Sequence, residues 1–495
     1  MELKPIGLEI SKAPTSSSTT SNPPESPAFP PYEEPPKGIS ILQNRLVLNP
    51  GITGLNYFAS LIHVVLVMFS HTVTTTLQPL ILLDPHSFNI DKRTSGVVLA
   101  KLMLVQTVVK ILVTPFIGHL IDKLGRRTVI FSGAAICCFG YLLVPFQTSV
   151  FPGYVFSKVL VANGGNIMNL TPLNADYIHD STKGKATGIS LALGSAGQFL
   201  GTLFVAMLLS MKFTLPAMHV ITGLTILGVA SVNLLGVKGG KYYMNERRNT
   251  EDGIERMPKE KVMKRLKEGF KVLCKNGWLL ISLTINTLAR ADYYLVTIIF
   301  ALYVKSYDET TEDSVESNHL ITKYQNLYFG LSLVGNLIYG QILDKINALK
   351  IIIPTMGTAI MAYFLGGFAD AKDSSLLLTL ILFAGMSMPG MLNAGNYLAI
   401  KNYPPAMRGV LGSLISIIGI AGYLFLSTVG GYLFDHWGRS APFWVFACML
   451  TASLTGVLII ATRGKLFKEV KSEKELVKAQ DSEDEVITGS ASSSI

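Results

Sequence analysis

The sequence predicts an all-α membrane protein with twelve transmembrane helices. Of its 495 residues, 49% are hydrophobic and only 15% are charged, a balance too apolar for a soluble protein. The length suffices for about twelve spans of roughly 20 residues each, and short polar segments separate the apolar runs. A short motif recurs in both halves of the chain, which predicts two six-helix bundles built as tandem copies.

The apolar runs divide the chain into five parts. Residues 1–50 are rich in Ser, Thr and Pro and cannot bury enough apolar surface to fold, so a disordered cytoplasmic tail is predicted. The two bundles occupy residues 51–237 and 277–463, a basic linker fills 238–276, and a second disordered tail covers 464–495. The spans are predicted near 55–80, 96–119, 128–147, 151–175, 186–211, 215–237, 277–304, 323–343, 349–369, 374–400, 408–433 and 441–462.

Lysine and arginine residues are distributed unevenly between the loops. The loops after even-numbered spans and the central linker are basic, whereas the loops after odd-numbered spans are neutral or acidic, as in 308–316. Lys92 and Arg93, after the first span, are the exception. Because cytoplasmic loops carry the excess of positive charge, both termini are predicted to face the cytoplasm, from the plasma membrane or from an internal vesicle membrane.

An amphipathic segment lies within the linker. Its apolar residues recur at helical spacing among basic residues, at Val262, Met263, Leu266, Phe270 and Leu273. The pattern suits a helix lying on the anionic inner leaflet. It suits a solvated linker helix equally well.

A ten-residue motif joins spans 2 and 3 on the side that receives positive charge. Gly118 allows a neighbouring helix to approach closely, and Asp122 is placed to pair with Arg126 or with the positive end of an adjacent helix. Gly125 allows the backbone to reverse, and Arg126 and Arg127 are expected to stay in the headgroup layer.

Parts of this motif and of the start of span 5 recur 222 to 225 residues later. Two separate features keep nearly the same offset, so the halves are interpreted as tandem copies. The matched positions are Gly118 with Gly340, Asp122 with Asp344, Lys183 with Arg408, and Gly184 with Gly409.

The pattern G-x3-D-K-x-G-R-R after a second apolar span resembles the loop signature of the major facilitator superfamily of transporters. The resemblance covers roughly residues 50–465. It implies two six-helix bundles, related by pseudo-twofold symmetry, that rock about a site near the bilayer midplane. It also implies a latch in which Asp122, Arg126 and Arg127, with Asp176, clamp the two bundles together on the cytoplasmic side. The second copy lacks the Gly-Arg-Arg, so its latch is expected to be weaker.

Two departures from the patterns of known subfamilies narrow the range of solutes that the chain could carry. Span 5 lacks the Gly-Pro step that is typical of the family's drug/proton antiporters. The chain after span 6 does not resemble the Pro-Glu-Ser-Pro-Arg-like segment of the family's sugar porters, so sugar transport is disfavoured.

Several polar residues of the first half lie deep in spans, where they usually face a cavity or each other. In span 2, Gln106 and Lys110 lie four residues apart on one helix face, and Lys110 is close to mid-depth. Span 4 offers Asn163 and Asn166, whose amides either bind a polar solute or hydrogen-bond to a neighbouring helix. His71 in span 1 is either a packing residue or a proton relay.

In the second half, span 7 carries an arginine and an aspartate near its middle. Arg290 lies on a polar stripe with Asn286 and Tyr294 that suits a water-filled cavity. Asp292 lies on another, apolar face of the helix. There its carboxylate must either pair with a cation on a neighbouring helix or carry a proton, and the first interpretation is favoured. Asn393 follows a Pro-Gly step in span 10, where a gate could bend.

These residues predict a secondary active transporter that moves a small polar solute by alternating access. Two cations, Lys110 and Arg290, favour an organic anion, or a zwitterion bound through its carboxylate, because a desolvated cation demands a counter-charge. Asp292 and His71 are the candidates for proton coupling. The alternatives are an organic-cation or drug:proton antiporter that uses Asp292, and a non-transporting membrane receptor or scaffold with the same fold.

Other functions find no support in the sequence. It has no paired carboxylates at catalytic spacing, no Ser/His/Asp pattern and no phosphate-binding Gly loop, so no enzyme is expected. Its four cysteines have neither disulfide-framework nor zinc spacing, so no metal or cofactor is expected. The expected partners are the solute and the lipid bilayer, without nucleic acid, and the protein is expected to be monomeric.

Overall fold

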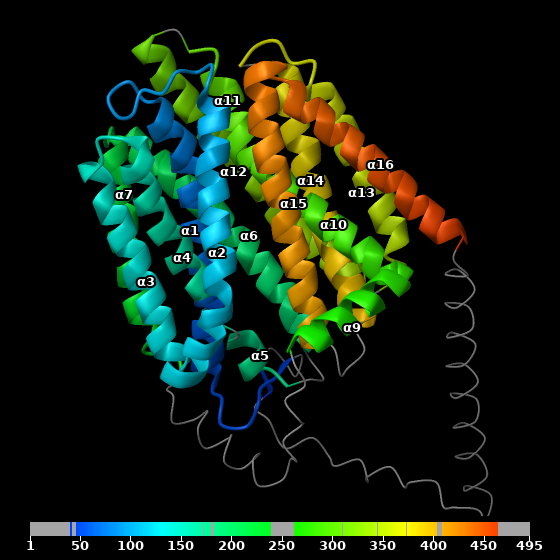
Figure 1. The fold of residues 1–495 in the computed structure, drawn as a ribbon. Helices are drawn as coiled ribbons and strands as arrows, with labels where there is room; N and C mark the ends of the chain where they lie inside the picture. The colour runs from blue at the N-terminus through cyan, green and yellow to red at the C-terminus, as the bar shows by residue number, and fades with distance from the viewer. Residues whose placement is uncertain are drawn as a thin grey trace, which may run out of the picture. The chain divides into compact units, whose positions relative to one another are not determined.

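The computed structural model describes residues 40–41, 46–171, 173–179, 183–238, 262–308, 310–343, 345–372, 374–402 and 408–463. The whole predicted C-terminal tail, most of the predicted N-terminal tail and residues 239–261 of the linker lie outside the described residues. The described chain is almost entirely helical, and Figure 1 shows long helices that run from one end of the two bundles to the other.

The N-terminal bundle is built from six long helices and several short elements. Its elements are α1 (Gly54–Leu83), α2 (Ser95–Leu124), α3 (Arg126–Leu143), η1 (Val144–Phe146), η2 (Val150–Tyr154), α4 (Val155–Asn169), α5 (Leu173–Tyr177), α6 (Lys183–Ser210) and α7 (Leu215–Asn233).

The C-terminal bundle follows the linker helix and again has six spans. The first of them, span 7 of the chain, is continuous through three consecutive elements, α10, η4 and α11. The elements are α9 (Val262–Lys275), α10 (Gly277–Tyr294), η4 (Leu295–Ile299), α11 (Phe300–Lys305), α12 (Thr311–Leu343), α13 (Leu349–Gly366), α14 (Ser375–Asn402), α15 (Arg408–His436) and α16 (Ala441–Arg463).

Ten of the described helices are long and apolar enough to cross a membrane. The other two spans are α4, which has only 15 residues, and α12, which has 33 residues and a polar beginning. Both pack against neighbouring spans, α4 against α3 and α12 against α14, and complete two sets of six. The twelve-helix, two-bundle arrangement predicted from the sequence is confirmed.

The predicted boundaries differ most at α12. The apolar run begins near residue 323, whereas the helix begins at Thr311. The helix therefore extends into the polar segment that precedes the apolar run, because a helix that reaches the water beyond a membrane does not need apolar side chains there.

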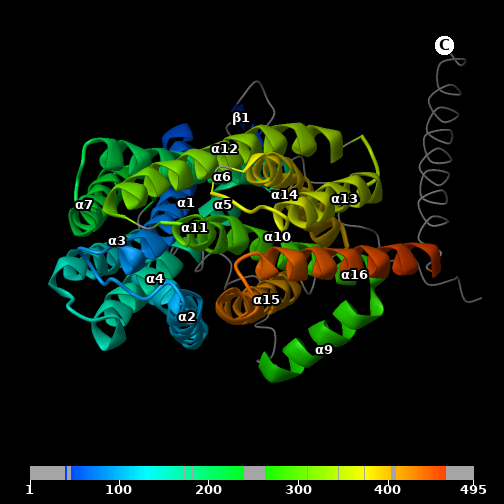
Figure 2. The same ribbon diagram turned by 90° about the horizontal axis from the view of Figure 1, so that it is seen from above.

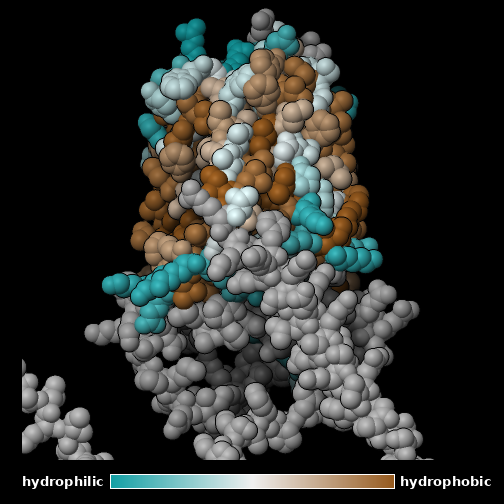
Figure 3. Space-filling model, turned by 90° about the vertical axis from the view of Figure 1, so that its right-hand side faces the viewer, coloured by the Kyte–Doolittle hydropathy of each residue, from teal (hydrophilic) through white to brown (hydrophobic). Residues whose placement is uncertain are grey.

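The bundles meet along two pairs of helices. α2 lies beside α15, and α6 lies beside α12 (Figure 2). On the face shown in Figure 3, hydrophobic side chains form a broad belt with hydrophilic side chains above and below it, as a membrane-embedded surface requires.

The two ends of the bundles hold different elements. The Asp435 end, at the top of Figure 1, holds the start of α2 and the last turn of α15. The Arg126 end, at the bottom, holds the α2–α3 junction, α5 and α9.

A short β pairing holds the chain before α1. β1 (Ser40–Ile41) pairs antiparallel with β2 (Leu46–Val47), and Leu48 forms a bridge with Ile178, just beyond α5. The prediction of a disordered tail as far as residue 50 is therefore wrong at its last residues, because Leu48 is fully buried there.

Candidate functional site

His71 lies at the boundary between the two bundles. It is exposed, although every later residue of α1, from 72 to 83, is buried. Its imidazole stacks on Tyr293 of α10, with ring centroids 5.2 Å apart and planes 14° from parallel. The Tyr293 hydroxyl lies 3.0 Å from Thr75 Oγ1 and 3.3 Å from Thr72 Oγ1, so the C-terminal bundle docks on this part of α1.

Lys110 lies on α2, half-buried and within electrostatic range of His71. Its other close ionisable neighbours are Lys158 of α4 and Cys137 of α3. Within the described part of the chain, no carboxylate forms an ion pair with Lys110 or Lys158. Among the described residues of the N-terminal bundle, basic groups therefore lie near one another without a paired carboxylate.

The sequence prediction missed Lys158, which is fully buried. Its ammonium donates a hydrogen bond to the Thr74 carbonyl at 3.1 Å and lies 5.6 Å from the centre of the Tyr154 ring. The hydroxyl of Tyr141, from α3, contacts the Thr74 hydroxyl on the same turn of α1. The sequence could have indicated this buried lysine, since Lys158 interrupts the otherwise nearly uncharged start of span 4.

The other polar residues predicted in the first half take part in packing within that bundle. Asn166 donates to Thr114 Oγ1 at 3.1 Å, which ties α4 to α2. Asn163 donates to the Val159 carbonyl at 2.8 Å. The Oδ1 of Asn163 and the Nε2 of Gln106 are buried without a hydrogen-bond partner among the described residues, so both keep unused bonding capacity.

The polar stripe predicted on α10 is largely packed against other helices. Asn286 donates to the Ser282 carbonyl at 3.0 Å, and the Tyr294 hydroxyl donates to the Ser427 carbonyl of α15 at 3.2 Å. Both side chains are buried. The water-filled stripe expected from the sequence is not found at these two positions.

Arg290 is the cation of this helix. It is half-buried, and its guanidinium lies against Gly419 of α15, where an added Cβ would come within 2.9 Å of Nη1. The glycine on α15 therefore makes the room that Arg290 occupies.

Asp292 is fully buried inside the C-terminal bundle. Its two carboxylate oxygens accept hydrogen bonds from the hydroxyls of Tyr328 on α12 and Tyr363 on α13, each at 2.5 Å. The favoured prediction of a cationic partner is therefore corrected: two tyrosines, not a lysine or arginine, satisfy the carboxylate. Both tyrosines are themselves fully buried.

This arrangement predicts that Asp292 stabilises the C-terminal bundle. Asp292→Leu would leave two buried hydroxyls without an acceptor, at a cost of about 1–3 kcal/mol each. We expect a lower midpoint of thermal unfolding for the purified protein than in the parent. Adding Tyr328→Phe and Tyr363→Phe to Asp292→Leu should recover much of the loss, and an unchanged midpoint in Asp292→Leu would contradict this role.

Asn393 of α14 lies in a chain of amide contacts that crosses between the bundles. It donates to Asn336 Oδ1 at 2.5 Å and to the Pro389 carbonyl at 2.8 Å. Asn336 of α12 donates in turn to Ser195 Oγ of α6 at 2.6 Å. Asn393 is therefore buried beside the α6–α12 contact, where it supports the bundle interface.

The Asp435 end is closed by a contact that the sequence did not predict. The carboxylate of Asp435, from α15, accepts hydrogen bonds from the backbone N–H groups of Gly96 at 3.0 Å and Val97 at 2.7 Å. Those groups are the unpaired donors of the first turn of α2, where the helix dipole also favours a negative charge. Beside them, Gly96 and Gly431 approach so closely that neither position has room for a Cβ. A residue of one bundle thus caps a helix of the other.

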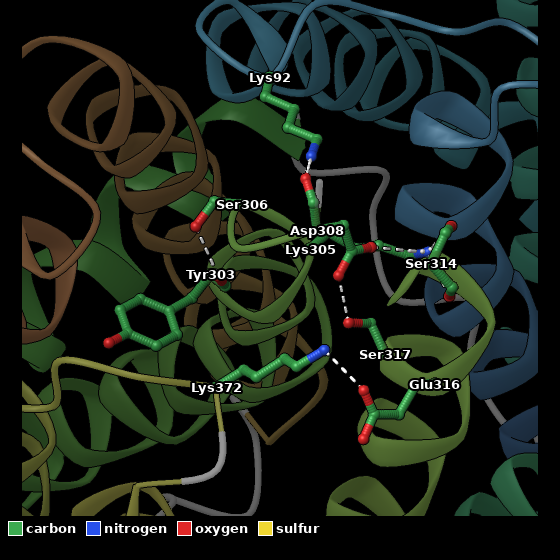
Figure 4. Close-up of polar contacts among 9 residues, drawn as sticks. All are labelled: Lys92, Tyr303, Lys305, Ser306, Asp308, Ser314, Glu316, Ser317 and Lys372. Carbon is green, nitrogen blue, oxygen red and sulfur yellow. Dashed lines mark hydrogen bonds and ion pairs between the residues drawn. The ribbon is translucent and has the colours of Figure 1, made fainter. Parts of the chain in front are cut away.

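A second contact closes the same end (Figure 4). Lys92, before α2, donates to the backbone carbonyl of Asp308, after α11. The Asp308 carboxylate accepts from Ser317 and lies 3.4 Å from the buried ammonium of Lys305, which also donates to Ser314 Oγ at 2.6 Å. Lys92, the exception in the predicted charge distribution, therefore bridges the two bundles.

A glycine in the left-handed region lies at the α2–α3 junction. Gly125 has φ of 82°, a conformation that favours glycine, at the position where α2 ends and α3 begins. Arg126 Nε lies 3.0 Å from Asp176 Oδ2, with both side chains largely buried. Since both residues belong to the N-terminal bundle, this ion pair ties α3 to α5 and does not join the two bundles as the predicted latch would.

Of the remaining motif residues, Arg127 and Gly340 have described surroundings. Arg127 is exposed, and Gly340 lies in α12 with open space around it. The surroundings of Gly118, Asp122, Lys183, Gly184, Arg408 and Gly409, and the whole of Asp344, lie outside the described residues.

Comparisons with known proteins agree with this architecture. The magnetosome protein MamH of Paramagnetospirillum magneticum is 22% identical over 393 residues, which cover 76% of this chain and 86% of that protein. The magnetosome protein MamZ of the same organism is 22% identical over 388 residues, or 75% of this chain, and the match spans 57% of MamZ.

A solved structure shows the same fold. The crystal structure of a D-xylose-proton symporter superposes with a TM-score of 0.59 and 13% sequence identity, covering 82% of this chain and 96% of that chain. At this identity the likeness concerns the fold alone. The family model described as Major Facilitator Superfamily matches residues 60–318 and 317–488, which together span most of the sequence. The chain therefore belongs to the major facilitator superfamily, and it is a multi-pass membrane transporter.

Proposed function

We propose that this transporter moves a small organic anion, or a zwitterion held through its carboxylate, by alternating access. The observation that carries the proposal is the gathering of Lys110, Lys158 and His71 without a paired carboxylate in the described N-terminal bundle. Arg290 supplies a further cation from the C-terminal bundle, on the half-buried part of α10. Cations that are shielded from water gain most from an anionic ligand, which favours a carboxylate-bearing solute.

The closed Asp435 end indicates which side the solute enters in this conformation. His71 is exposed while α1 beyond it is buried, which supports access to the site from the Arg126 end. The basic loops favour a cytoplasmic location for the Arg126 end, with both termini on that side. On this proposal, the structure corresponds to a cytoplasm-facing state of the cycle.

The drug:proton antiporter alternative finds less support. Asp292, the carboxylate that would bind an organic amine, is fully buried, and both of its oxygens accept from tyrosines of the same bundle. An amine would have to displace those two hydrogen bonds before it could bind.

Uptake into sealed liposomes by the purified protein tests the proposal. The panel contains labelled carboxylates, amino acids, amines and sugars, each measured with and without a pH gradient. We expect uptake of solutes that carry a carboxylate, and Lys110→Ala or Arg290→Ala should lower it about 30-fold or more, because losing one partner of a buried charge pair costs about 2–5 kcal/mol.

Lys101→Ala is the matched control, since Lys101 is an exposed lysine on the same helix, and its uptake should equal that of the parent. Uptake of amines that depends on Asp292 would instead identify a cation antiporter. Specific binding without flux would identify a receptor. Unchanged uptake in both the Lys110 and the Arg290 variant would rule out the anion site.

A further inference from the structure

The linker helix α9 is attached to the C-terminal bundle by one face. Leu273 is buried and packs in a cluster with Leu279 of α10, Ala399 of α14, and Leu411 and Ile415 of α15. These contacts lie at the Arg126 end of three membrane-spanning helices. α9 is therefore a fixed part of the bundle and follows its movements.

The opposite face of α9 combines positive charge with an unpacked aromatic ring. Lys267, Phe270, Lys271, Cys274 and Lys275 are all exposed, and their spacing of three and four residues places them on one side of the helix. Phe270 is 52% exposed, although a phenylalanine gains nothing from contact with bulk water. Lysines around an outward phenylalanine are the pattern of a helix that lies in a membrane interface.

The position of α9 agrees with that pattern. Figures 1 and 2 show the helix across the lower end of the C-terminal bundle, outside α15 rather than between the bundles. Its 14 residues contain five basic side chains and one acidic side chain, which gives the segment a strong positive charge. Lys350 at the start of α13 and Lys401 at the end of α14 add exposed positive charge at the same end.

We propose that the exposed face of α9 is a binding surface for anionic phospholipid headgroups. The lysine ammonium groups pair with the headgroup phosphates or carboxylates, and the Phe270 ring enters the boundary of the acyl chains. A zwitterionic lipid offers no net charge to this face, so the surface distinguishes lipids by charge. Because Leu273 joins α9 to α10, α14 and α15, bound lipid holds the Arg126 end of these helices together. The surface is independent of which solute is carried.

Tryptophan fluorescence offers a direct test because Trp278 lies three residues after Lys275, whereas Trp437 and Trp444 lie at the opposite end. The full-length Trp437→Phe, Trp444→Phe protein is reconstituted in liposomes that contain increasing fractions of brominated phosphatidylglycerol or brominated phosphatidylcholine. We expect half-maximal quenching of Trp278 at a mole fraction of brominated phosphatidylglycerol about tenfold lower than for phosphatidylcholine, and high salt should weaken the preference.

The test variant carries Lys267→Gln, Lys271→Gln and Lys275→Gln, and it should lose the preference while its thermal midpoint stays that of the parent. A control with equal loss of charge carries Arg93→Gln, Lys212→Gln and Lys323→Gln, three exposed positions toward the Asp435 end. The control should keep the preference. Equal quenching by both lipids in the parent, or an unchanged preference in the test variant, would overturn the proposal and leave α9 a solvated linker helix.

Discussion

Gly431→Val is expected to prevent the Asp435 end from closing. A Cβ at position 431 would overlap the backbone carbonyl of Gly96, and backbone atoms of two packed helices cannot move aside cheaply. The start of α2 and the end of α15 would have to separate, which also breaks the hydrogen bonds from Gly96 and Val97 to Asp435. The transporter should then favour the state that is open at this end.

Spin-label distances measure this separation. Labels are placed at Arg93→Cys and Arg439→Cys, two exposed positions beside the closure, in a protein whose exposed Cys274 and Cys448 are replaced by Ser. Gly431→Val should move most of the distance distribution to longer values. Gly228→Val is the control, because a Cβ at Gly228 meets no other atom within 4 Å. If the Gly431 variant gave the parent's distribution, the glycine contact would not be what holds this end closed.

Asp435→Ala is expected to open the same end by a different route. The carboxylate makes two charge-assisted hydrogen bonds to the first turn of α2, and it also interacts favourably with the helix dipole. Losing them should cost the closed state about 2 kcal/mol, which corresponds to a shift of roughly 30-fold in the ratio of closed to open molecules. The same pair of spin labels reports the change.

Two further variants separate the charge from the hydrogen bonds. Asp435→Asn keeps one acceptor oxygen but no charge, so its shift should lie between those of the parent and Asp435→Ala. Glu316→Gln removes another carboxylate at the same end, where Glu316 pairs with Lys372 on the surface. This variant should change the ratio of closed to open molecules little, because exposed ion pairs contribute little to stability. A shift in Glu316→Gln as large as that in Asp435→Ala would indicate general electrostatics rather than capping of α2.

Only some residues of the candidate site could be predicted from the sequence. The position of Lys110 inside the N-terminal bundle could be predicted from its depth in an apolar run, because a charged side chain at that depth must find a polar environment. The same rule applied to Lys158 would have found it. Periodicity assigned Asn286 and Tyr294 to a polar face, but it could not say that α14 and α15 would cover that face. Asp292 shows the same limit, since its partners Tyr328 and Tyr363 lie 36 and 71 residues away.

The sequence by itself determined the membrane location, the twelve spans, the two halves and the junction glycine at position 125. These features depend on composition, on apolar runs of membrane length and on local backbone preference, all of which are readable along the chain. The tertiary structure alone decided that Asp435 caps α2, that Lys92 bridges to Asp308, and that Arg126 pairs within its own bundle. Such contacts join residues from about 50 to 340 positions apart, and only the packing of whole helices brings their few polar atoms within hydrogen-bonding distance.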